Sequence, residues 1–558
     1  MKTTALLAVA GVVGLVFPAA APYSASGIHE SPTIVRTAAG KVRGVQGTGY
    51  TQWLGIPYAA DPSGANRWQP PRPVPAWSGV RDATAFGDRC AQNSTWDPGY
   101  EKAVTTEDCL SLNVYAPDNA PARTPVLVWI HGGGLVNGAG QDYNPREFVE
   151  QTGAVVVTVN YRLGVLGTLN LPPLVGGNYG FLDQQAALRW VHANIAGFGG
   201  DPANVTLLGQ SAGAGAVCNQ LASPTAKGLF SRAVLMSGGG CSLLPAATGQ
   251  AQSEAFAQAV GCGGAVDVLA CLRAAPAADL LAAQQKAPVA PSMGGAAFPA
   301  DPGAVIQTGD FNRVPVLIGQ TDAERSLFTF QAYDYLGAPM TAAQYEASVR
   351  AAYGANADKV LAEYPLSAYP TPGQAWSAAQ NGSSMYARQQ LMATLSKWVP
   401  TYAYEFAESD TPHYVSLFLA QQAGPPARDY PFGGAVHNDD LGYLWDYLGQ
   451  TLPYDDDQLE LSRQMIGYWG RFAASGDPNG VGGPAWPRYR PAPGEMMSLV
   501  ACDTPPAGNR APAACSHVFG DFAQEHDLGF WAGLNGATAT GTNPAAAISP
   551  PRGATVHG

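Results

Sequence analysis

The sequence predicts an α/β fold built on a large, mostly parallel β-sheet with helices on both faces. Two apolar runs, "TPVLVWI" from Thr124 and "AVVVTV" from Ala154, end in glycine or polar turns, and "FLDQQAALRWVHANI" from Phe181 has apolar residues at helical spacing. Strands that are apolar throughout are buried on both faces, which is typical of a parallel sheet covered by helices. Such sheets place their chemistry at the carboxyl ends of the strands.

The composition favours one large globular unit. Of the 558 residues, 46% are hydrophobic and 13% are charged, which is enough to bury an extensive core. No long polar linker interrupts the chain, so we expect a single domain over residues 27–532 with insertions. The net charge of −12 argues against a nucleic-acid partner or a stable partner in an anionic membrane. Abundant Ala, Gly and Pro, with Arg more frequent than Lys, suggest a bacterial source.

The two ends of the chain differ from its body. Residues 1–26 contain one early lysine, an apolar stretch and then small residues, which is the pattern of a secretory signal peptide and predicts a secreted, extracellular protein. An uncleaved membrane anchor is the alternative. After Trp531 the sequence is rich in Gly, Ala, Thr and Pro, and we expect residues 533–558 to form a disordered tail.

The eight cysteines predict disulfides, because an even number in an exported chain is typical of such a framework. Short separations favour the pairs Cys90 with Cys109, Cys262 with Cys271 and Cys502 with Cys515, which leaves Cys218 and Cys241 for each other. A free buried thiol is the alternative at each position. The sequence has no C-x-x-C or H-x-x-x-H spacing, so we expect no metal site.

The segment "GQSAG", Gly209 to Gly213, follows the apolar run that begins at Val205 and fits the nucleophile-elbow pattern G-x-S-x-G. In that motif the glycines allow the strand and the next helix to pass close together, and the serine, here Ser211, presents its hydroxyl at the sheet edge. The pentapeptide alone is a weak signal, because Gly, Ser and Ala are abundant in this chain.

A serine hydroxyl needs a histidine base and an orienting carboxylate to act as a nucleophile near neutral pH. Among the histidines after Ser211, His437 lies in the glycine-flanked turn "GGAVHNDDLGYLW", which suits a catalytic loop. Asp322 and Glu324 both follow the apolar run "VPVLIG", and composition does not choose between them. The other histidines that follow the serine are His413, His517, His526 and His557.

Two further segments bear on such a site. "HGGG", from His131 to Gly134, ends an earlier apolar strand and could supply backbone N–H groups for an oxyanion, although it could also be a simple tight turn. Residues 327–400 are rich in Ala, Tyr and Gln with helical spacing and without clear strands. We expect this region to be a helical cap over the sheet edge.

Several stretches resemble the type B carboxylesterase and cholinesterase family. "FGGDPANVTLLGQSAG" is similar to its serine signature, "EDCLSLNVYAP" is similar to its second signature, and "NYRLGVLG", "NYGFLDQQAALRWV" and "WGRFAASGDPN" follow in order. The resemblance runs from about Thr33 to Trp531. It implies the α/β-hydrolase fold and a serine hydrolase that cleaves carboxylic esters through an acyl-enzyme, without a cofactor.

The resemblance also implies roles for individual residues. The family's G-x-x-x-D-E-G segment lies over residues 319–325, which assigns its acid to Glu324, with Arg325 where glycine is usual, and the H-x-x-E/D-L segment assigns its histidine to His437. Ser211 is then the nucleophile. The implied oxyanion donors are the N–H groups of Gly133, Gly134 and Ala212. The pairs Cys90 with Cys109 and Cys262 with Cys271 resemble family disulfides, and Arg67 with Glu107 resembles a family ion pair.

The expected substrate is a small-molecule ester with a short to medium acyl chain. Many cholinesterases carry an acidic residue before the serine, whereas Gln210 is neutral, and Trp96 is only a loose candidate for a cation-π site. A choline ester is therefore disfavoured. A lipase for long-chain esters and a non-catalytic binding module of the same fold are the alternatives.

Overall fold

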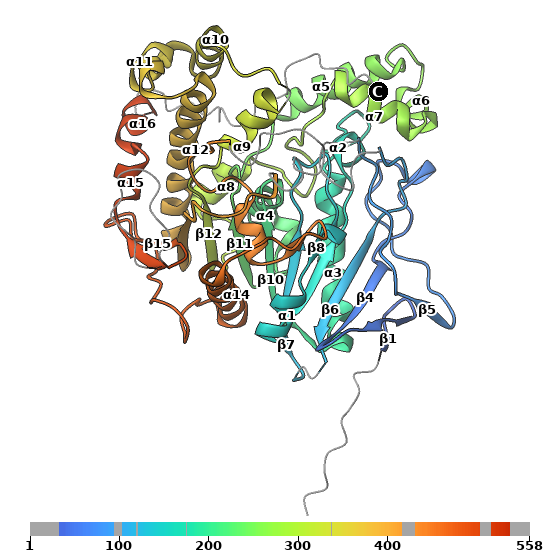
Figure 1. Cartoon of the computed structure of the whole chain (residues 1–558). Coiled ribbons are helices and arrows are strands. Elements are labelled where there is room, and N and C mark those ends of the chain that lie inside the picture. The colour runs from blue at the N-terminus through green and yellow to red at the C-terminus, as the bar shows by residue number, and fades with distance from the viewer. Residues whose placement is uncertain are drawn as a thin grey trace, which may run out of the picture.

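The computed structural model describes residues 33–93, 103–118, 121–174, 176–335, 337–415, 430–502 and 515–535. The predicted signal peptide, most of the predicted tail and Trp96 lie outside these residues. In the described part, one large sheet runs through the molecule with helices on both of its faces (Figure 1).

The main sheet has eleven strands in the order β16-β15-β13-β12-β11-β10-β7-β9-β6-β4-β3. The strands from β15 to β9 in this order pair in parallel, and antiparallel pairs flank them at both ends. The parallel strands are β7 (Thr124–Ile130), β9 (Val155–Val159), β10 (Gly200–Gln210), β11 (Arg232–Met236), β12 (Val316–Thr321), β13 (Thr401–Phe406) and β15 (Met496–Leu499). The flanking strands are β3 (Val45–Gln46), β4 (Tyr50–Pro57), β6 (Ser111–Pro117) and β16 (His517–Phe519). The predicted mostly parallel sheet is confirmed.

Strand β7 explains why the central strands are apolar at every position. Val126, Val128 and Ile130 belong to the core on one face, and Leu127 and Trp129 belong to the core on the other. Because successive side chains of a strand point to opposite faces, both faces must be covered. The first core is covered by α3 (Tyr179–Asn194), α4 (Ala212–Ala222) and α12 (Pro372–Ser396), and the second by α1 (Arg146–Thr152) and α14 (Asp456–Ser475).

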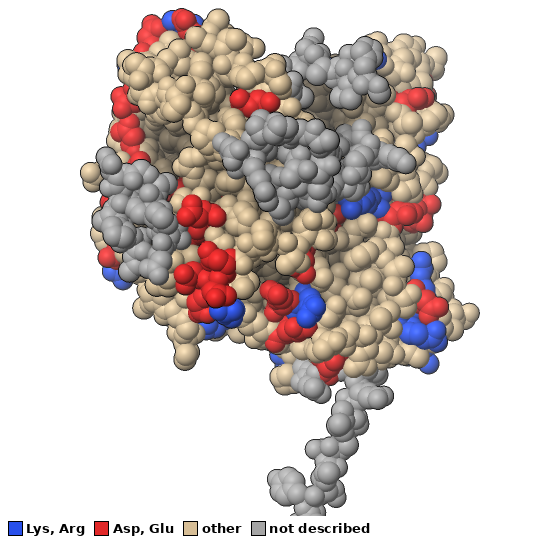
Figure 2. Space-filling model, viewed as in Figure 1, with Lys and Arg blue, Asp and Glu red and all other residues tan. Residues whose placement is uncertain are grey.

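Smaller elements complete the framework. A three-stranded sheet contains β1 (Ile34–Arg36), β2 (Lys41–Arg43) and β5 (Val80–Asp82), and β8 (Tyr143–Asn144) pairs with β14 (Asp446–Tyr447). The short helices are α2 (Gly164–Thr168), α8 (Pro302–Thr308) and α15 (Phe522–Glu525). On the face seen in Figure 2, acidic and basic side chains are scattered, and no broad basic patch is visible among the described residues.

Helices gather beyond the carboxyl ends of the parallel strands. The predicted cap region holds α9 (Ser326–Thr329), a π-helical turn (Phe330–Asp334), α10 (Ala342–Tyr353), α11 (Ala357–Glu363) and the long α12. A second helical group, α5 (Ala246–Val260), α6 (Val268–Ala274) and α7 (Ala277–Lys286), lies at the same end of the molecule on its other side (Figure 1). The sequence analysis did not single out this second group.

The C-terminal helix α16 (Leu528–Asn535) continues past the predicted domain boundary at residue 532. Trp531 and Leu534 are buried in one cluster with Ala375 and Ala379 of α12, so this helix completes the packing of the cap. No helix in the described ranges combines the length and the apolar character that a membrane span requires.

Disulfides and a buried ion pair link separate segments of the chain. The four disulfides are Cys90–Cys109, Cys218–Cys241, Cys262–Cys271 and Cys502–Cys515, which are the pairs that the spacing predicts. Each closes a loop in the unfolded chain, and such a link typically stabilises a fold by about 2–4 kcal/mol. The Arg67–Glu107 ion pair is present, and Nη1 of Arg67 also donates to the carbonyl of Ala275 at 2.8 Å, just after α6.

Candidate active site

Ser211 forms the turn between β10 and α4 and has a strained backbone, with φ 59° and ψ −125°. A positive φ is uncommon for a residue with a side chain and persists only where the surroundings hold it. Here the Ser211 N–H donates to the carbonyl of Met236 at 2.9 Å, and its carbonyl accepts from Gly215 at 3.0 Å. The side chain is therefore fixed at the carboxyl end of a central strand.

The two glycines of the elbow are required by space. A Cβ on Gly209 would lie 2.6 Å from the carbonyl carbon of Gly213 and 2.7 Å from the carbonyl oxygen of Ile130. A Cβ on Gly213 would lie 2.1 Å from the same oxygen of Ile130. Strand β10, helix α4 and the end of β7 thus meet at a point where no side chain fits, which explains the G-x-S-x-G pattern in steric terms.

The HGGG loop lies directly against this elbow. A Cβ on Gly132 would lie 3.0 Å from the carbonyl of Gln210 and 3.1 Å from Cβ of Ser211. Gly133 and Gly134 have φ of 93° and 65° and are exposed. Their N–H groups have no hydrogen-bond acceptor among the described residues. Two unpaired donors therefore lie beside the serine, where they can stabilise a developing negative charge.

His131 packs against the glycine loop. Its ring stacks on Tyr161 with centroids 4.3 Å apart, and Nδ1 lies 2.9 Å from the carbonyl oxygen of Gly132. Burial lowers the pKa of His131 to about 4, so the ring is neutral near pH 7. The histidine serves to pack the glycine loop.

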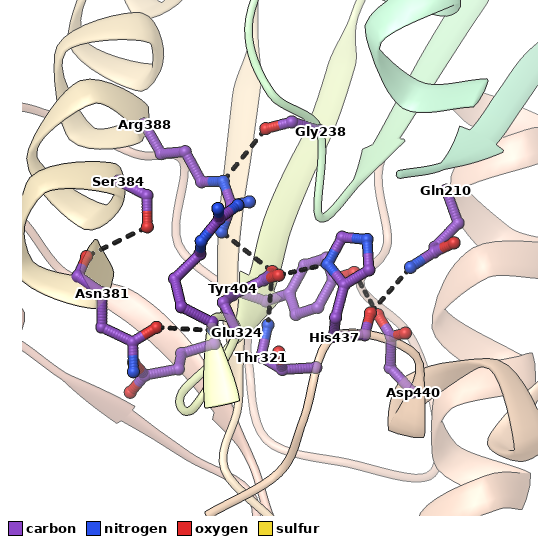
Figure 3. Close-up of polar contacts among 12 residues, drawn as sticks. Gln210, Gly238, Thr321, Glu324, Asn381, Ser384, Arg388, Tyr404, His437 and Asp440 are labelled. Atoms are coloured by element: carbon purple, nitrogen blue, oxygen red, sulfur yellow. Dashed lines mark hydrogen bonds and ion pairs between the residues drawn. The ribbon is translucent and has the colours of Figure 1, made fainter. Parts of the chain in front are cut away.

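Glu324, rather than Asp322, is brought to His437. Nδ1 of His437 contacts Oε2 of Glu324, and the carboxylate is fully buried (Figure 3). Asp322 instead accepts the N–H of Ala435 at 2.7 Å and so anchors the segment that leads to His437. Burial alone would raise the pKa of Glu324, but the neighbouring Arg388 and His437 outweigh it and hold that pKa at about 2. Glu324 is therefore ionised at neutral pH.

Gln210 fastens the histidine loop to the serine elbow. Its Nε2 donates to the carbonyl of His437 at 2.7 Å, and Gln210 immediately precedes Ser211 (Figure 3). Nε2 of His437 is buried and has no hydrogen-bond partner within the described ranges, so no bond joins it to the Ser211 hydroxyl here. Such contacts often tighten only when substrate binds.

Asp439 closes a turn within the histidine loop. Its Oδ2 accepts the N–H of Val436 at 2.6 Å and lies 2.7 Å from Nδ1 of His413. Burial would lower the pKa of His413, but the charge of Asp439 outweighs it and raises that pKa. His413 is therefore occupied in supporting the loop and is directed to a different carboxylate from His437.

A second histidine–glutamate pair lies one strand away from the first. Nε2 of His526 contacts Oε1 of Glu405 at the end of β13, and Glu405 is fully buried. In the sheet register Glu405 pairs with Gln320 of β12, so the two pairs lie on neighbouring strands. No sequence pattern indicates this pair, because 121 residues separate its members.

Two ionisable neighbours of Glu324 were assigned no role from the sequence. Arg388 of α12 forms an ion pair with Glu324, with Nη1 and Oε1 2.8 Å apart. Asp440 is fully buried, and its Oδ2 accepts the hydroxyl hydrogen of Tyr404 at 3.1 Å. Burial, and then the charge of Glu324, raise the pKa of Asp440 to about 8. Asp440 is thus mostly protonated at neutral pH, and Glu324 carries the negative charge of this cluster.

The geometry agrees with the comparison against known protein families. The sequence model of the carboxylesterase family matches residues 31–513. This chain belongs to the carboxylesterase family. Membership makes the chain an α/β-hydrolase and a serine hydrolase of carboxylic esters.

Curated relatives of this carboxylesterase are esterases from bacteria and a mammal. The para-nitrobenzyl esterase of Bacillus subtilis (strain 168) is 34% identical over 84% of this chain and 94% of its own length. The fumonisin B1 esterase of Sphingopyxis macrogoltabida is 34% identical over 84% of this chain and 87% of its own. The cocaine esterase of Oryctolagus cuniculus is 34% identical over 82% of this chain and 90% of its own.

The steric constraints on the elbow predict that alanine substitutions at two glycines of α4 have very different effects on the free energy of unfolding of this carboxylesterase. Gly213→Ala pushes a methyl group against the carbonyl of Ile130 and should lower the free energy of unfolding by about 3 kcal/mol or more, with loss of esterase activity. Gly215→Ala is the control, because its Cβ would lie 3.7 Å from the carbonyl of Gly240, an ordinary contact. Denaturant unfolding of both variants measures the difference, and equal stability of the two would contradict the packing argument.

Proposed function

We propose that this carboxylesterase uses Ser211 as its nucleophile, His437 as its general base and Glu324 as the acid that orients the base. One observation carries this proposal: His437 is bound on one side to the buried carboxylate of Glu324 and is tied through its carbonyl to Gln210, the residue next to Ser211. The remaining ring nitrogen of His437 is then the one available to a serine proton.

The proposed reaction proceeds in two halves. His437 takes the hydroxyl proton as Ser211 Oγ attacks the ester carbonyl, and the N–H groups of Gly133, Gly134 and Ala212 stabilise the resulting oxyanion. The tetrahedral intermediate then expels the alcohol, which receives the proton from His437, and an acyl-serine remains. Water attacks the acyl-serine with His437 again as base, which releases the carboxylic acid and restores Ser211. Each step uses only side chains, backbone N–H groups and water.

We further propose a preference for small-molecule esters with short to medium acyl chains. A relative named as a medium-chain fatty acyl-CoA hydrolase from Anas platyrhynchos, 30% identical over 82% of this chain and 87% of its own, supports the medium range. The relatives named for para-nitrobenzyl, fumonisin B1 and cocaine esters indicate that the family accepts varied alcohols. The neutral Gln210 beside Ser211 offers no negative charge to a choline cation.

A series of p-nitrophenyl esters from acetate to palmitate tests both parts of this proposal. Ser211→Ala should lower kcat by about 10⁴-fold or more on every ester while the folded state persists, because the nucleophile alone is removed. The wild type should be fastest on the shorter chains. A maximum at palmitate would indicate a lipase instead, and turnover retained in a clean preparation of the Ser211→Ala protein would remove this serine from the mechanism.

The two histidine–glutamate pairs provide a matched test of the base. His437→Gln should abolish ester turnover, because Gln keeps a donor toward Glu324 but cannot accept a proton. His526→Gln makes the same change beside Glu405 and should leave kcat within about threefold while lowering the free energy of unfolding by about 1–3 kcal/mol. If His437→Gln and His526→Gln lower kcat equally while both proteins remain folded, the proposal that His437 is the base is contradicted.

We also propose that the protein is secreted. The signal-like pattern of residues 1–26 supports export, and so do the four disulfides, which form and persist in oxidising compartments. Intact-mass measurement and N-terminal sequencing of the mature protein should place its first residue near position 26. A mature chain that begins at Met1 would contradict cleavage of a signal peptide.

A further inference from the structure

Arg388 joins the cap to the proposed catalytic acid. It lies on α12, its residue is 8% exposed, and its Nη1 is 2.8 Å from Oε1 of Glu324. Its Nε donates to the carbonyl of Gly238 at 3.0 Å, in the loop that follows β11 (Figure 3). One guanidinium therefore connects a cap helix, the sheet edge and the carboxylate that holds His437.

The two carboxylate oxygens of Glu324 have different partners. Oε1 of Glu324 is taken by Arg388 and by the N–H of Thr321 at 3.3 Å, and Oε2 is left for Nδ1 of His437. A buried carboxylate with both oxygens engaged cannot rotate away from the imidazole without breaking a charged contact. Arg388 of α12 thereby restrains the imidazole ring of His437 through its contact with Glu324.

The ion pair also sets the charge that faces the imidazole. The other charged or titratable groups around it are Arg325 on the same turn, Tyr404 on β13, Asp439 and Asp440 beyond His437, and Asp322 on the β12 loop. Asp439 is engaged by His413, and Asp440 is mostly protonated at neutral pH. Arg388 thus balances the Glu324 charge, and the imidazolium formed during the reaction faces an ionised carboxylate that is paired with a guanidinium.

The neighbouring pair has different surroundings. Nε2 of His526 contacts Oε1 of Glu405, and Oε2 of Glu405 has no hydrogen-bond partner in the described part of the chain. Burial would lower the pKa of His526, but the charge of Glu405, and then those of Asp322 and Glu525, raise it. His526 is therefore surrounded by carboxylates, whereas the glutamate beside His437 is paired with a guanidinium.

We propose that Arg388 is a positioning residue of this esterase, which orients Glu324 toward His437 and balances the charge of its carboxylate. The inference rests on the roles proposed above for Glu324 and His437. It gives α12 a role in the site, because this helix then holds the acid as well as covering the sheet edge.

The pH profile of kcat/KM for 1-naphthyl acetate, measured in a pH-stat, tests this role. Loss of the positive charge leaves the imidazolium facing an unbalanced carboxylate, so Arg388→Gln should move the acid limb upward by about one pH unit and lower kcat/KM by up to about tenfold on the acid side of the profile. Arg388→Lys keeps the charge and should leave the limb within about 0.3 units of the wild type.

Arg67→Gln is the matched control. Arg67 is likewise a buried arginine paired with a glutamate, and it also donates to main-chain carbonyls, but its partner Glu107 does not contact His437. This variant should lose stability without moving the acid limb. If the limb of Arg388→Gln coincides with that of Arg67→Gln, Arg388 only packs α12 and the inference is overturned.

A double variant separates this inference from the proposed function. Glu324→Gln should lower kcat/KM by about 10²-fold or more, and adding Arg388→Gln to it should cause no further loss, because the arginine then has no carboxylate to balance. Full activity in Glu324→Gln would overturn the role of the acid and the inference together. Loss in Glu324→Gln combined with an unmoved limb in Arg388→Gln would overturn the inference alone.

Discussion

The close approach of three backbones around Ser211 is the constraint on which the rest of the site depends. Strand β10 must end, turn through a positive φ and continue as α4 within contact of the Ile130 carbonyl, and only glycine at positions 209 and 213 leaves space for this. The same contact brings the HGGG loop, which continues from β7, against the serine. One steric arrangement thus positions both the proposed nucleophile and the proposed oxyanion donors.

The remaining groups reach this point from other strand ends, which the parallel sheet collects at one edge. Glu324 follows β12, the loop of His437 is anchored through Asp322 and Asp439, and Gln210 joins that loop to the elbow. Gln210, Glu324 and His437 are each more than 100 residues apart in the sequence. The order of the strands in the sheet therefore explains why the proposed acid, base and nucleophile, which come from distant segments, lie at the same sheet edge.

The sequence predicted those features that are local or carried by a motif. The parallel sheet follows from apolar runs, the elbow from its glycines and the disulfides from short separations. Composition alone left Asp322 and Glu324 open, because both follow the same strand, and the family resemblance was needed to choose. Arg388 could not be predicted, since a single arginine on a polar-looking helix gives no signal until α12 is placed over β12. The helices α5 and α7 are rich in alanine and carry no motif, so the sequence pattern did not distinguish them.

The two buried histidine–glutamate pairs show why the surroundings of such a pair matter as much as its contact. Burial of a carboxylate is costly, and the cost can be offset by a proton on the histidine or by a second cation. Glu405 contacts His526 and raises the pKa of that histidine, and the contact suits a structural link between the sheet edge and the C-terminal helices. Glu324 has a second cation beside it, because Arg388 supplies a permanent charge. A base must release and regain its proton in each cycle, and a carboxylate whose charge is already balanced leaves the imidazole free to do so.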